Sequence, residues 1–346
     1  MSDRQTQAAY PSQDWPQADA RTVGFDVGQL ERLHCWLNEQ AGTRPFRVLL
    51  VRHGYLVAEW QKDLTVDERR SLASAAKSVY SSILGIAVAE GKIPSADARV
   101  VDYYPEMMDV PEGRGPKAGR NAFPKDRAIT FRQLISNTSG YMKPGEEPGR
   151  AFNYQTFGMN IITHALGTIY GVYDTATPGE RPGFGQLIDR YVKEPIGGSW
   201  DYRYTNFQHE PGARVEVFGN YCQIDSSARD MARLGLLWLR WGCWGDRQVL
   251  PEGWLRSATR VAPDVLENCS QDTWSYGYAF WTNAYGLLWP ALPHDSYAAS
   301  GAGSQHIWVC PSRDLVVVQG PGIFDKQEDA RCNHVLEAAY NAIVEP

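Results

Sequence analysis

A serine and a lysine three residues apart are the first candidates for chemistry in this chain. Ser74 and Lys77 lie within the run LASAAKSVYSS, residues 72–82. A serine hydroxyl becomes a useful nucleophile when a neighbouring base takes its proton in the transition state. Side chains at positions i and i+3 of a helix are neighbours, and burial favours the neutral amine that can act as this base. The pair therefore predicts acyl transfer, with Ser74 as nucleophile and Lys77 as base.

The spacing alone does not decide between this chemistry and a structural serine beside a solvated lysine. The chain has 20 serines and 8 lysines among 346 residues, so about 0.5 occurrences of Ser-x-x-Lys are expected by chance. The sequence around the pair must therefore decide whether Ser74 and Lys77 are catalytic or structural.

Hydrophobic periodicity predicts the elements that must hold this pair. A helical pattern around residues 27–38 precedes two strands, 46–52 and 55–60, which are joined at His53 and Gly54. The stretch 94–263 is helical and loop-rich. Its helical patterns occupy residues 129–140, 159–171, 184–192 and 226–242. The remaining patterns are strands in 274–286, 296–300, 305–311 and 314–320, followed by a helix in 327–344.

Strands at both ends of the chain and helices between them predict an α/β fold. One sheet is built from the two termini and flanked by helices, and a largely helical region is inserted into it. We expect residues 1–93 and 270–346 to form the sheet domain and residues 94–269 the helical domain. The active site is expected in the cleft between the two.

The composition limits the kinds of molecule that the protein is expected to bind. The net charge of −6, the pI near 5.7 and the absence of a basic run argue against nucleic acid and against an anionic membrane. The first 20 residues are polar and later apolar runs are too short to span a bilayer, so we expect a cytoplasmic protein. The six cysteines form no CxxC pair and the seven histidines show no metal-binding spacing, which predicts no metal and no cofactor.

The sequence around Ser74 and Lys77 resembles that of the serine β-lactamases and penicillin-binding-protein-like hydrolases, the class C β-lactamase-related family. The motifs that carry the resemblance are Gly91-Lys92, Asp97, the Tyr-x-Pro-Glu segment at 103–106 and the Leu-Ile-Ser-Asn-Thr-Ser-Gly loop at 134–140. The similarity extends from about Gly24 over nearly the whole chain. It implies a β-lactamase/DD-peptidase-like fold with an antiparallel sheet, and it assigns Ser74 and Lys77 to the first catalytic element.

The second element of the family is usually Tyr-x-Asn, and the aligned residues are Tyr154, Gln155 and Thr156. Tyr154 matches the tyrosine, which can shuttle a proton between the nucleophile and the leaving group. Thr156 replaces the asparagine. The alternative is that Tyr154, one of 18 tyrosines, only packs.

The third element is a Lys-Thr-Gly or His-x-Gly on an edge strand. Gly301 matches its glycine, whereas Ala299 stands where lysine or histidine is usual. The resemblance implies an oxyanion hole made by the backbone N–H groups of Ser74 and Ala302. The residues it implies for substrate binding are Gln155, Thr156, Ser300 and Gly301.

The missing cation of the third element leaves a substrate carboxylate without an obvious anchor. We therefore expect the esterase and 6-aminohexanoate-dimer hydrolase branch: a serine hydrolase that forms an acyl-enzyme with a small ester or amide. β-Lactamase or D-amino-acid peptidase activity is one alternative, and a non-catalytic binding protein on the same scaffold is another. An α/β-hydrolase is disfavoured because the chain has no Gly-x-Ser-x-Gly elbow. The oligomeric state stays open.

Two groups of residues could contact the substrate, but the sequence does not show where they lie relative to the site. Three arginines can still supply the missing charge from a neighbouring loop: Arg132, Arg150 and Arg203. Eight aromatic residues either line an apolar acyl pocket or belong to the core: Trp274, Tyr276, Tyr278, Phe280, Trp281, Tyr285, Trp289 and Tyr297.

Overall fold

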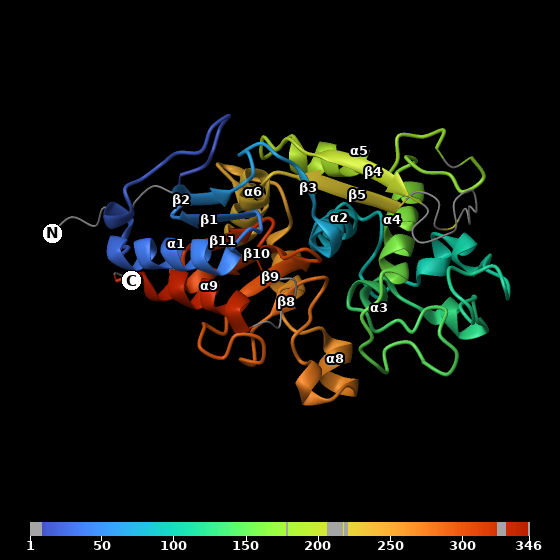
Figure 1. The fold of residues 1–346 in the computed structure, drawn as a ribbon. Coiled ribbons are helices and arrows are strands. Elements are labelled where there is room, and N and C mark those ends of the chain that lie inside the picture. The colour runs from blue at the N-terminus through green and yellow to red at the C-terminus, as the bar shows by residue number, and fades with distance from the viewer. Residues whose placement is uncertain (1–8, 178, 206–216, 218–220, 324–329, 345–346) are drawn as a thin grey trace.

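A six-stranded antiparallel sheet lies in the half of the molecule that also holds α1 and α9 (Figure 1). The structure is a computed structural model that describes residues 9–177, 179–205, 217, 221–323 and 330–344. The strand order is β2-β1-β11-β10-β9-β8. The strands are β1 (Phe46–Arg52), β2 (Tyr55–Lys62), β8 (Trp281–Thr282), β9 (Tyr297–Gly301), β10 (Gln305–Cys310) and β11 (Leu315–Gln319). Because β1 pairs with β11, the prediction of one sheet built from both chain termini is confirmed.

The β1–β2 hairpin turns at the predicted position. His53 and Gly54 both have positive φ angles, 54° and 83°. A two-residue turn of this kind matches the right-handed twist of the flanking strands. All seven residues of β1 are buried, since helices cover both faces of the sheet.

Helices α1 (Val27–Ala41) and α9 (Ala330–Asn341) cover one face of the sheet, and α6 (Ala228–Leu239) covers the other (Figure 1). The alternation along β11 reflects this arrangement, because Leu315 and Val317 belong to the cluster on the α1/α9 side and Val316 to the cluster with α6. At Gly235 an added Cβ would lie 2.5 Å from a methyl carbon of Val316. The glycine therefore lets α6 approach the sheet closely.

Helix α2 (Ala76–Ala89) connects the sheet to the remaining helices. Its residues from Ala76 to Ala87 are all buried, the lysine and serines among them included. It contacts β9 on one side and α4, α5 and α7 on others. The remaining α-helices among the described residues are α3 (Phe131–Ile135), α4 (Phe157–Ile169), α5 (Gly185–Ile188), α7 (Glu252–Ala258) and α8 (Pro263–Asn268).

The largely helical insertion also contains strands that the sequence analysis did not predict. A three-stranded sheet of order β3-β5-β4 joins β3 (Arg70–Ser71), β4 (Asp201–Thr205) and β5 (Tyr221–Ser226). A short hairpin pairs β6 (Cys243–Trp244) with β7 (Arg247–Gln248). These strands are short and largely polar, so their hydrophobic period is weak. The predicted domain limits stay a prediction.

Two further predicted elements are shorter than expected. The helix predicted over 129–140 ends as α3 at Ile135, because Asn137 adopts a left-handed conformation with φ of 58°. The strand predicted over 274–286 is reduced to β8. Its neighbours Tyr278 and Ala279 donate their backbone N–H groups to the carbonyls of Ala258 and Ile135 instead of to a strand. The start of the predicted C-terminal helix, residues 327–329, lies outside the described residues.

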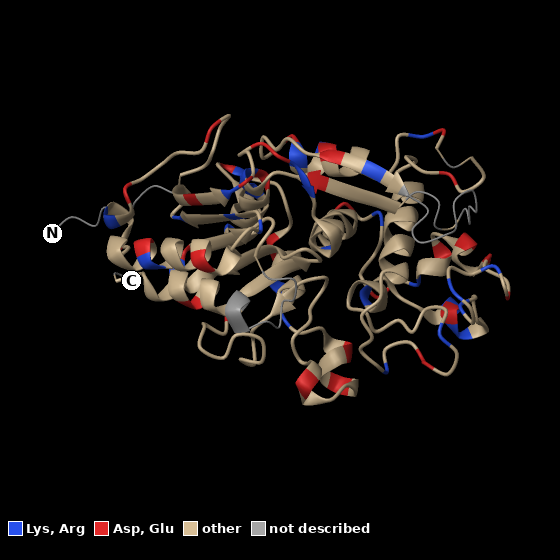
Figure 2. Cartoon of the chain, viewed as in Figure 1, with Lys and Arg blue, Asp and Glu red and all other residues tan. Residues whose placement is uncertain are grey.

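Helix length and the distribution of charge both bear on contact with a membrane. Within the described residues, every helix is too short or too polar to cross a bilayer. Figure 2 shows basic and acidic residues interspersed along the chain in this view.

Candidate active site

Ser74 lies in a turn of 3₁₀-helix, Ala73–Ala75, that leads directly into α2. The turn starts at Ala73, whose φ is 47°. Lys77, on the first turn of α2, is 1% exposed and places its Nζ 2.6 Å from Ser74 Oγ. The i, i+3 spacing therefore brings the two side chains into hydrogen-bond contact, and the lysine is buried as the apolar flanks predicted.

Tyr154 joins this pair from the loop before α4. Its hydroxyl accepts a hydrogen bond of 2.9 Å from Lys77 Nζ. Lys77 Nζ thus lies within hydrogen-bond reach of both the serine and the tyrosine oxygens. This distance is within the reach that proton transfer requires, so the geometry keeps Tyr154 in the candidate site.

Two aromatic rings hold the side chain of Tyr154, although 40% of the residue is exposed. Trp281 stacks on it with ring centroids 5.7 Å apart and planes 20° apart. Tyr276 meets it edge-on at 5.8 Å, and Tyr276 also contacts Trp281 at 4.9 Å. Burial holds the pKa of the Tyr276 phenol well above its ordinary value, so this ring stays neutral beside the site.

The sequence placed both rings in an aromatic-rich segment without relating either to Tyr154. Tyr276 and Trp281 face each other across an antiparallel bridge, and this pairing brings both rings to Tyr154. Most of the other aromatic residues in this segment are buried in the core: Tyr278, Phe280, Trp289 and Tyr297. Tyr285, by contrast, is exposed and packs against Trp274.

Gly301, the last residue of β9, lies against the turn that carries Ser74. A Cβ at this position would lie 2.2 Å from the carbonyl oxygen of Leu72 and 2.9 Å from the backbone nitrogen of Ser74. In the described part of the chain, the ladder between β8 and β9 ends at Ala298, so the strand edge next to Ser74 is left open. Only glycine permits this approach of the strand to the turn that carries Ser74.

Gly301→Ala is therefore expected to lower kcat/KM by at least about 100-fold, because the added methyl group displaces the strand end from Ser74. The measurement is ester hydrolysis together with thermal unfolding. Gly253→Ala is the matched control: Gly253 is helical and an added Cβ meets nothing within 4 Å. That variant should retain its activity and stability. An active Gly301→Ala enzyme would show that the close approach is not needed.

The other predicted site residues lie around this centre. Gln155 is buried, and its side-chain nitrogen donates to Ser139 Oγ at 3.3 Å. Thr156 is the N-cap residue of α4, and its carbonyl accepts a hydrogen bond from the backbone N–H of Asn160. Ser300 lies opposite His306 in the β9–β10 ladder. Their roles in substrate binding stay predictions, as does the oxyanion role of Ser74 and Ala302.

The groups that could replace the missing cation of the third element are neutral or already paired. Ala299 is fully buried, and burial lowers the pKa of His306, the partner of Ser300, to about 4. The arginines named from the sequence all have partners: Arg132 with Asp97 and Asp264, Arg150 with Asn268, and Arg203 with Asp225. Arg132 and Arg203 are thus paired with carboxylates, whereas the partner of Arg150 is the neutral amide of Asn268. Ala299 and His306 supply no positive charge at pH 7.

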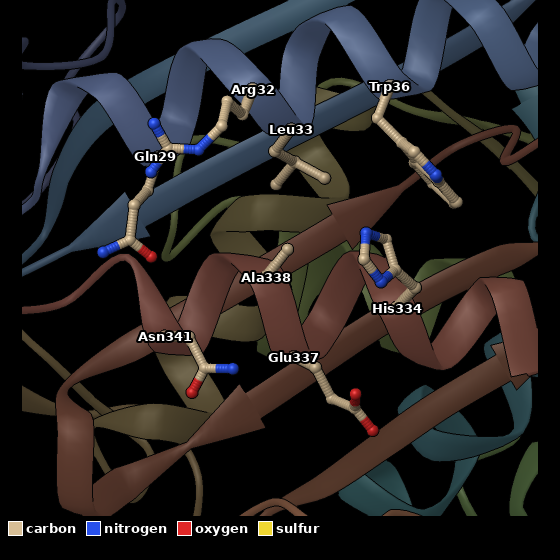
Figure 3. A pocket seen from close by; sticks show the side chains of 8 residues that line it. All are labelled: Gln29, Arg32, Leu33, Trp36, His334, Glu337, Ala338 and Asn341. Carbon is tan, nitrogen blue, oxygen red and sulfur yellow. The ribbon is translucent and has the colours of Figure 1, made fainter.

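A pocket of about 420 Å³ lies elsewhere, between α1 and α9 (Figure 3). Its lining residues are Gln29, Arg32, Leu33, Trp36, His334, Glu337, Ala338 and Asn341. None of the candidate catalytic residues is among them, and these helices cover the face of the sheet opposite α6. Within the described residues, no group of three histidine, cysteine, aspartate or glutamate side chains is placed to hold a metal ion.

Comparison with known proteins decides the family. The family model described as Beta-lactamase matches residues 41–319, most of the chain. The chain belongs to the beta-lactamase family. The predicted resemblance is confirmed at the level of the family.

A curated relative supports the assignment over a shorter segment. "Beta-lactamase-like protein 1" from Dictyostelium discoideum is 36% identical over 112 residues. The match covers 30% of this chain and 17% of that protein, so the chain spans only a small part of this beta-lactamase-family relative.

Solved structures share the fold at low sequence identity. A penicillin-binding-protein homologue from Caulobacter crescentus has a TM-score of 0.67 at 16% identity, over 91% of this chain and 97% of that one. A family VIII carboxylesterase has a TM-score of 0.66 at 16% identity, over 94% and 99%. A candidate 6-aminohexanoate-dimer hydrolase from Bacillus anthracis has a TM-score of 0.63 at 17% identity, over 98% and 89%. These similarities confirm the predicted beta-lactamase-like fold.

Proposed function

We propose that the protein is a serine esterase or amidase that forms an acyl-enzyme at Ser74. The observation that carries the proposal is the contact of three polar groups at the base of α2. Lys77 Nζ lies 2.6 Å from Ser74 Oγ and 2.9 Å from the hydroxyl of Tyr154. A nucleophile, a base and a second proton-transfer group are thus within reach of one another.

The acylation step follows from these distances. Lys77, in its neutral form, takes the proton of Ser74 as Oγ attacks the substrate carbonyl carbon. The oxyanion that forms is stabilised by the backbone N–H groups of Ser74 and Ala302. Tyr154 then delivers a proton to the leaving alcohol or amine, and Lys77 reprotonates Tyr154.

Deacylation uses the same groups in reverse. Water attacks the acyl-enzyme while Tyr154 and Lys77 accept its proton, and Ser74 Oγ leaves with a proton returned to it. The products are the carboxylic acid and the regenerated enzyme, so no cofactor is consumed.

A fluorophosphonate probe tests the proposal directly. We expect one probe to attach per chain, with the mass increase on the peptide that contains Ser74. Absence of labelling in folded protein would instead favour the alternative of a non-catalytic binding protein on the same scaffold.

The substrate proposed is a small neutral ester or amide. A cationic partner for a substrate carboxylate contributes about 1.5 to 3 kcal/mol through a charge-assisted hydrogen bond. Ala299 provides no such partner and His306 is neutral at pH 7, because its pKa is lowered to about 4. Carboxylate-bearing β-lactams therefore lose more binding energy here than neutral esters do.

We accordingly expect kcat/KM for a short-chain p-nitrophenyl ester to exceed that for a chromogenic cephalosporin by at least about tenfold. The measurement is a panel of p-nitrophenyl acetate, p-nitrophenyl butyrate, a linear amide and the cephalosporin. Equal efficiency on the cephalosporin would favour β-lactamase or D-amino-acid peptidase activity, which the family and the likeness to a penicillin-binding-protein homologue keep as the second candidate. The cytoplasmic location stays a prediction.

A further inference from the structure

Asn137 occupies an unusual place between α3 and the loop that carries Tyr154. It follows α3 by two residues and adopts a left-handed conformation with φ of 58°. Asparagine tolerates this region better than most residues with a Cβ, because its short side chain bonds locally. The side chain is 1% exposed, so its amide is committed to the interior of the protein.

The main chain on both sides of Tyr154 is bonded to this one residue. The backbone N–H of Asn153 donates to the carbonyl oxygen of Asn137 at 2.9 Å. The backbone N–H of Gln155 donates to the side-chain oxygen Oδ1 of Asn137, also at 2.9 Å. The main chain is therefore held one residue before Tyr154 by a backbone acceptor and one residue after it by a side-chain acceptor.

Asn137 is itself anchored to a short, well-bonded helix. Its own N–H donates to the carbonyl of Leu134, and the next N–H, that of Thr138, donates to the carbonyl of Gln133. The N-terminus of α3 is closed by a reciprocal capping pair between Thr130 and Gln133. The position of the two acceptors is thus set by α3.

Apart from its bonds to Asn137, the loop beside Tyr154 is held by two side-chain hydrogen bonds, from Asn153 to Glu146 at 2.7 Å and from Gln155 to Ser139 at 3.3 Å. Residues 151–155 are neither helix nor strand, and Tyr154 is 40% exposed. Trp281 and Tyr276 orient the ring, but they do not fix the main chain at Tyr154. A main chain free to shift would carry the hydroxyl away from Lys77 Nζ, and a displacement of about 1 Å at such a site can cost 100-fold in rate.

We propose that Asn137 is a positioning residue that holds Tyr154 in proton-transfer contact with Lys77. The inference rests on the proposed function, since it assumes that Tyr154 transfers a proton in the acyl-enzyme mechanism. Asn137 touches no reacting atom and acts through the peptides of Asn153 and Gln155.

Two variants separate the side-chain acceptor from the backbone conformation. Asn137→Gly keeps the left-handed conformation and the carbonyl acceptor but removes Oδ1. Asn137→Asp keeps an oxygen at the Oδ1 position and also tolerates this conformation. Asn268→Gly is the matched control, because Asn268 Oδ1 also accepts one hydrogen bond, from Arg150 at 3.0 Å, on an exposed part of the same region.

The readouts are kcat and KM for p-nitrophenyl butyrate, each at the pH optimum of the variant and expressed per site labelled by the fluorophosphonate probe. We expect Asn137→Gly to lower kcat by at least about tenfold with KM changed by less than about threefold. Asn137→Asp should recover most of the loss, and Asn268→Gly should resemble the wild type. Counting labelled sites removes any contribution of unfolded protein.

The outcomes distinguish the inference from the function on which it rests. A wild-type protein that neither hydrolyses esters nor reacts with the probe would overturn the proposed function. A wild-type protein that does both, together with an Asn137→Gly variant of at least half its kcat, would overturn the positioning role alone. Equal losses in Asn137→Gly and Asn137→Asp would also overturn it, because the acceptor would then not be the property that matters.

Discussion

Ser74→Ala is expected to reduce turnover of an activated ester by at least about 10³-fold. The substitution removes one oxygen from a partly exposed side chain, and that oxygen is the proposed attacking atom. This oxygen accepts a hydrogen bond from Lys77 Nζ, and the fold should lose little when that bond is removed. The measurement is steady-state hydrolysis of p-nitrophenyl butyrate, with circular dichroism and thermal unfolding to establish that the variant is folded.

Ser257→Ala is a suitable control for this variant. Its hydroxyl donates to the carbonyl of Gly253 within α7 and is exposed, so activity should stay near that of the wild type. Substantial turnover by purified Ser74→Ala protein, with no labelling elsewhere, would mean that the nucleophile is another group or a water molecule.

Lys77→Arg is expected to lower kcat by about 10² to 10⁴-fold, although the positive charge is retained. A guanidinium group stays protonated at every working pH and cannot accept the proton of the serine. A guanidinium group is also larger than an ammonium group. Lys77 is only 1% exposed, so its site has little room for the larger group. Steady-state rates between pH 6 and 10 measure the effect, since no part of this range should restore the activity.

A second variant separates the charge from the shape. Lys77→Met fits the same apolar surroundings without a charge, and it should be equally inactive because it too has no base. Lys92→Arg, on the exposed turn after α2, is the control and should behave as the wild type. Near-normal rates in Lys77→Arg would give the lysine a structural role and would require another base.

Part of this site could be predicted from the sequence because it depends on local geometry. Ser74 and Lys77 meet through i, i+3 spacing across the 3₁₀ turn and the start of α2, and the burial of Lys77 follows from the apolar residues around it. The sheet from both termini follows from alternating apolar strands at the two ends of the chain. Tyr154 has no local signal of this kind and was placed through the resemblance to the family.

The remaining features depend on contacts between segments far apart in the chain. The stacking of Trp281 on Tyr154 joins residues whose rings are indistinguishable, in the sequence, from those of the buried aromatic core. The hydrogen bonds of Asn137 to the main chain around Tyr154 follow from its left-handed conformation, which a helical pattern over 129–140 conceals. Strands β4 and β5 were missed because their polar residues weaken the period that reveals a strand.

The pairing of β1 with β11 also has a consequence for how the protein is made. Val48 in β1 lies opposite Gln319 in β11. At a synthesis rate of 5–20 residues per second, β11 is therefore completed roughly 15 to 50 s after β1. During that interval the completed β1–β2 hairpin presents an apolar, unpaired strand edge to other chains. Gly301 reaches the nucleophile turn only after β9 has been synthesised, so a nascent chain has no assembled catalytic centre. We therefore expect yield, more than specific activity, to respond to slower translation or to chaperone supply.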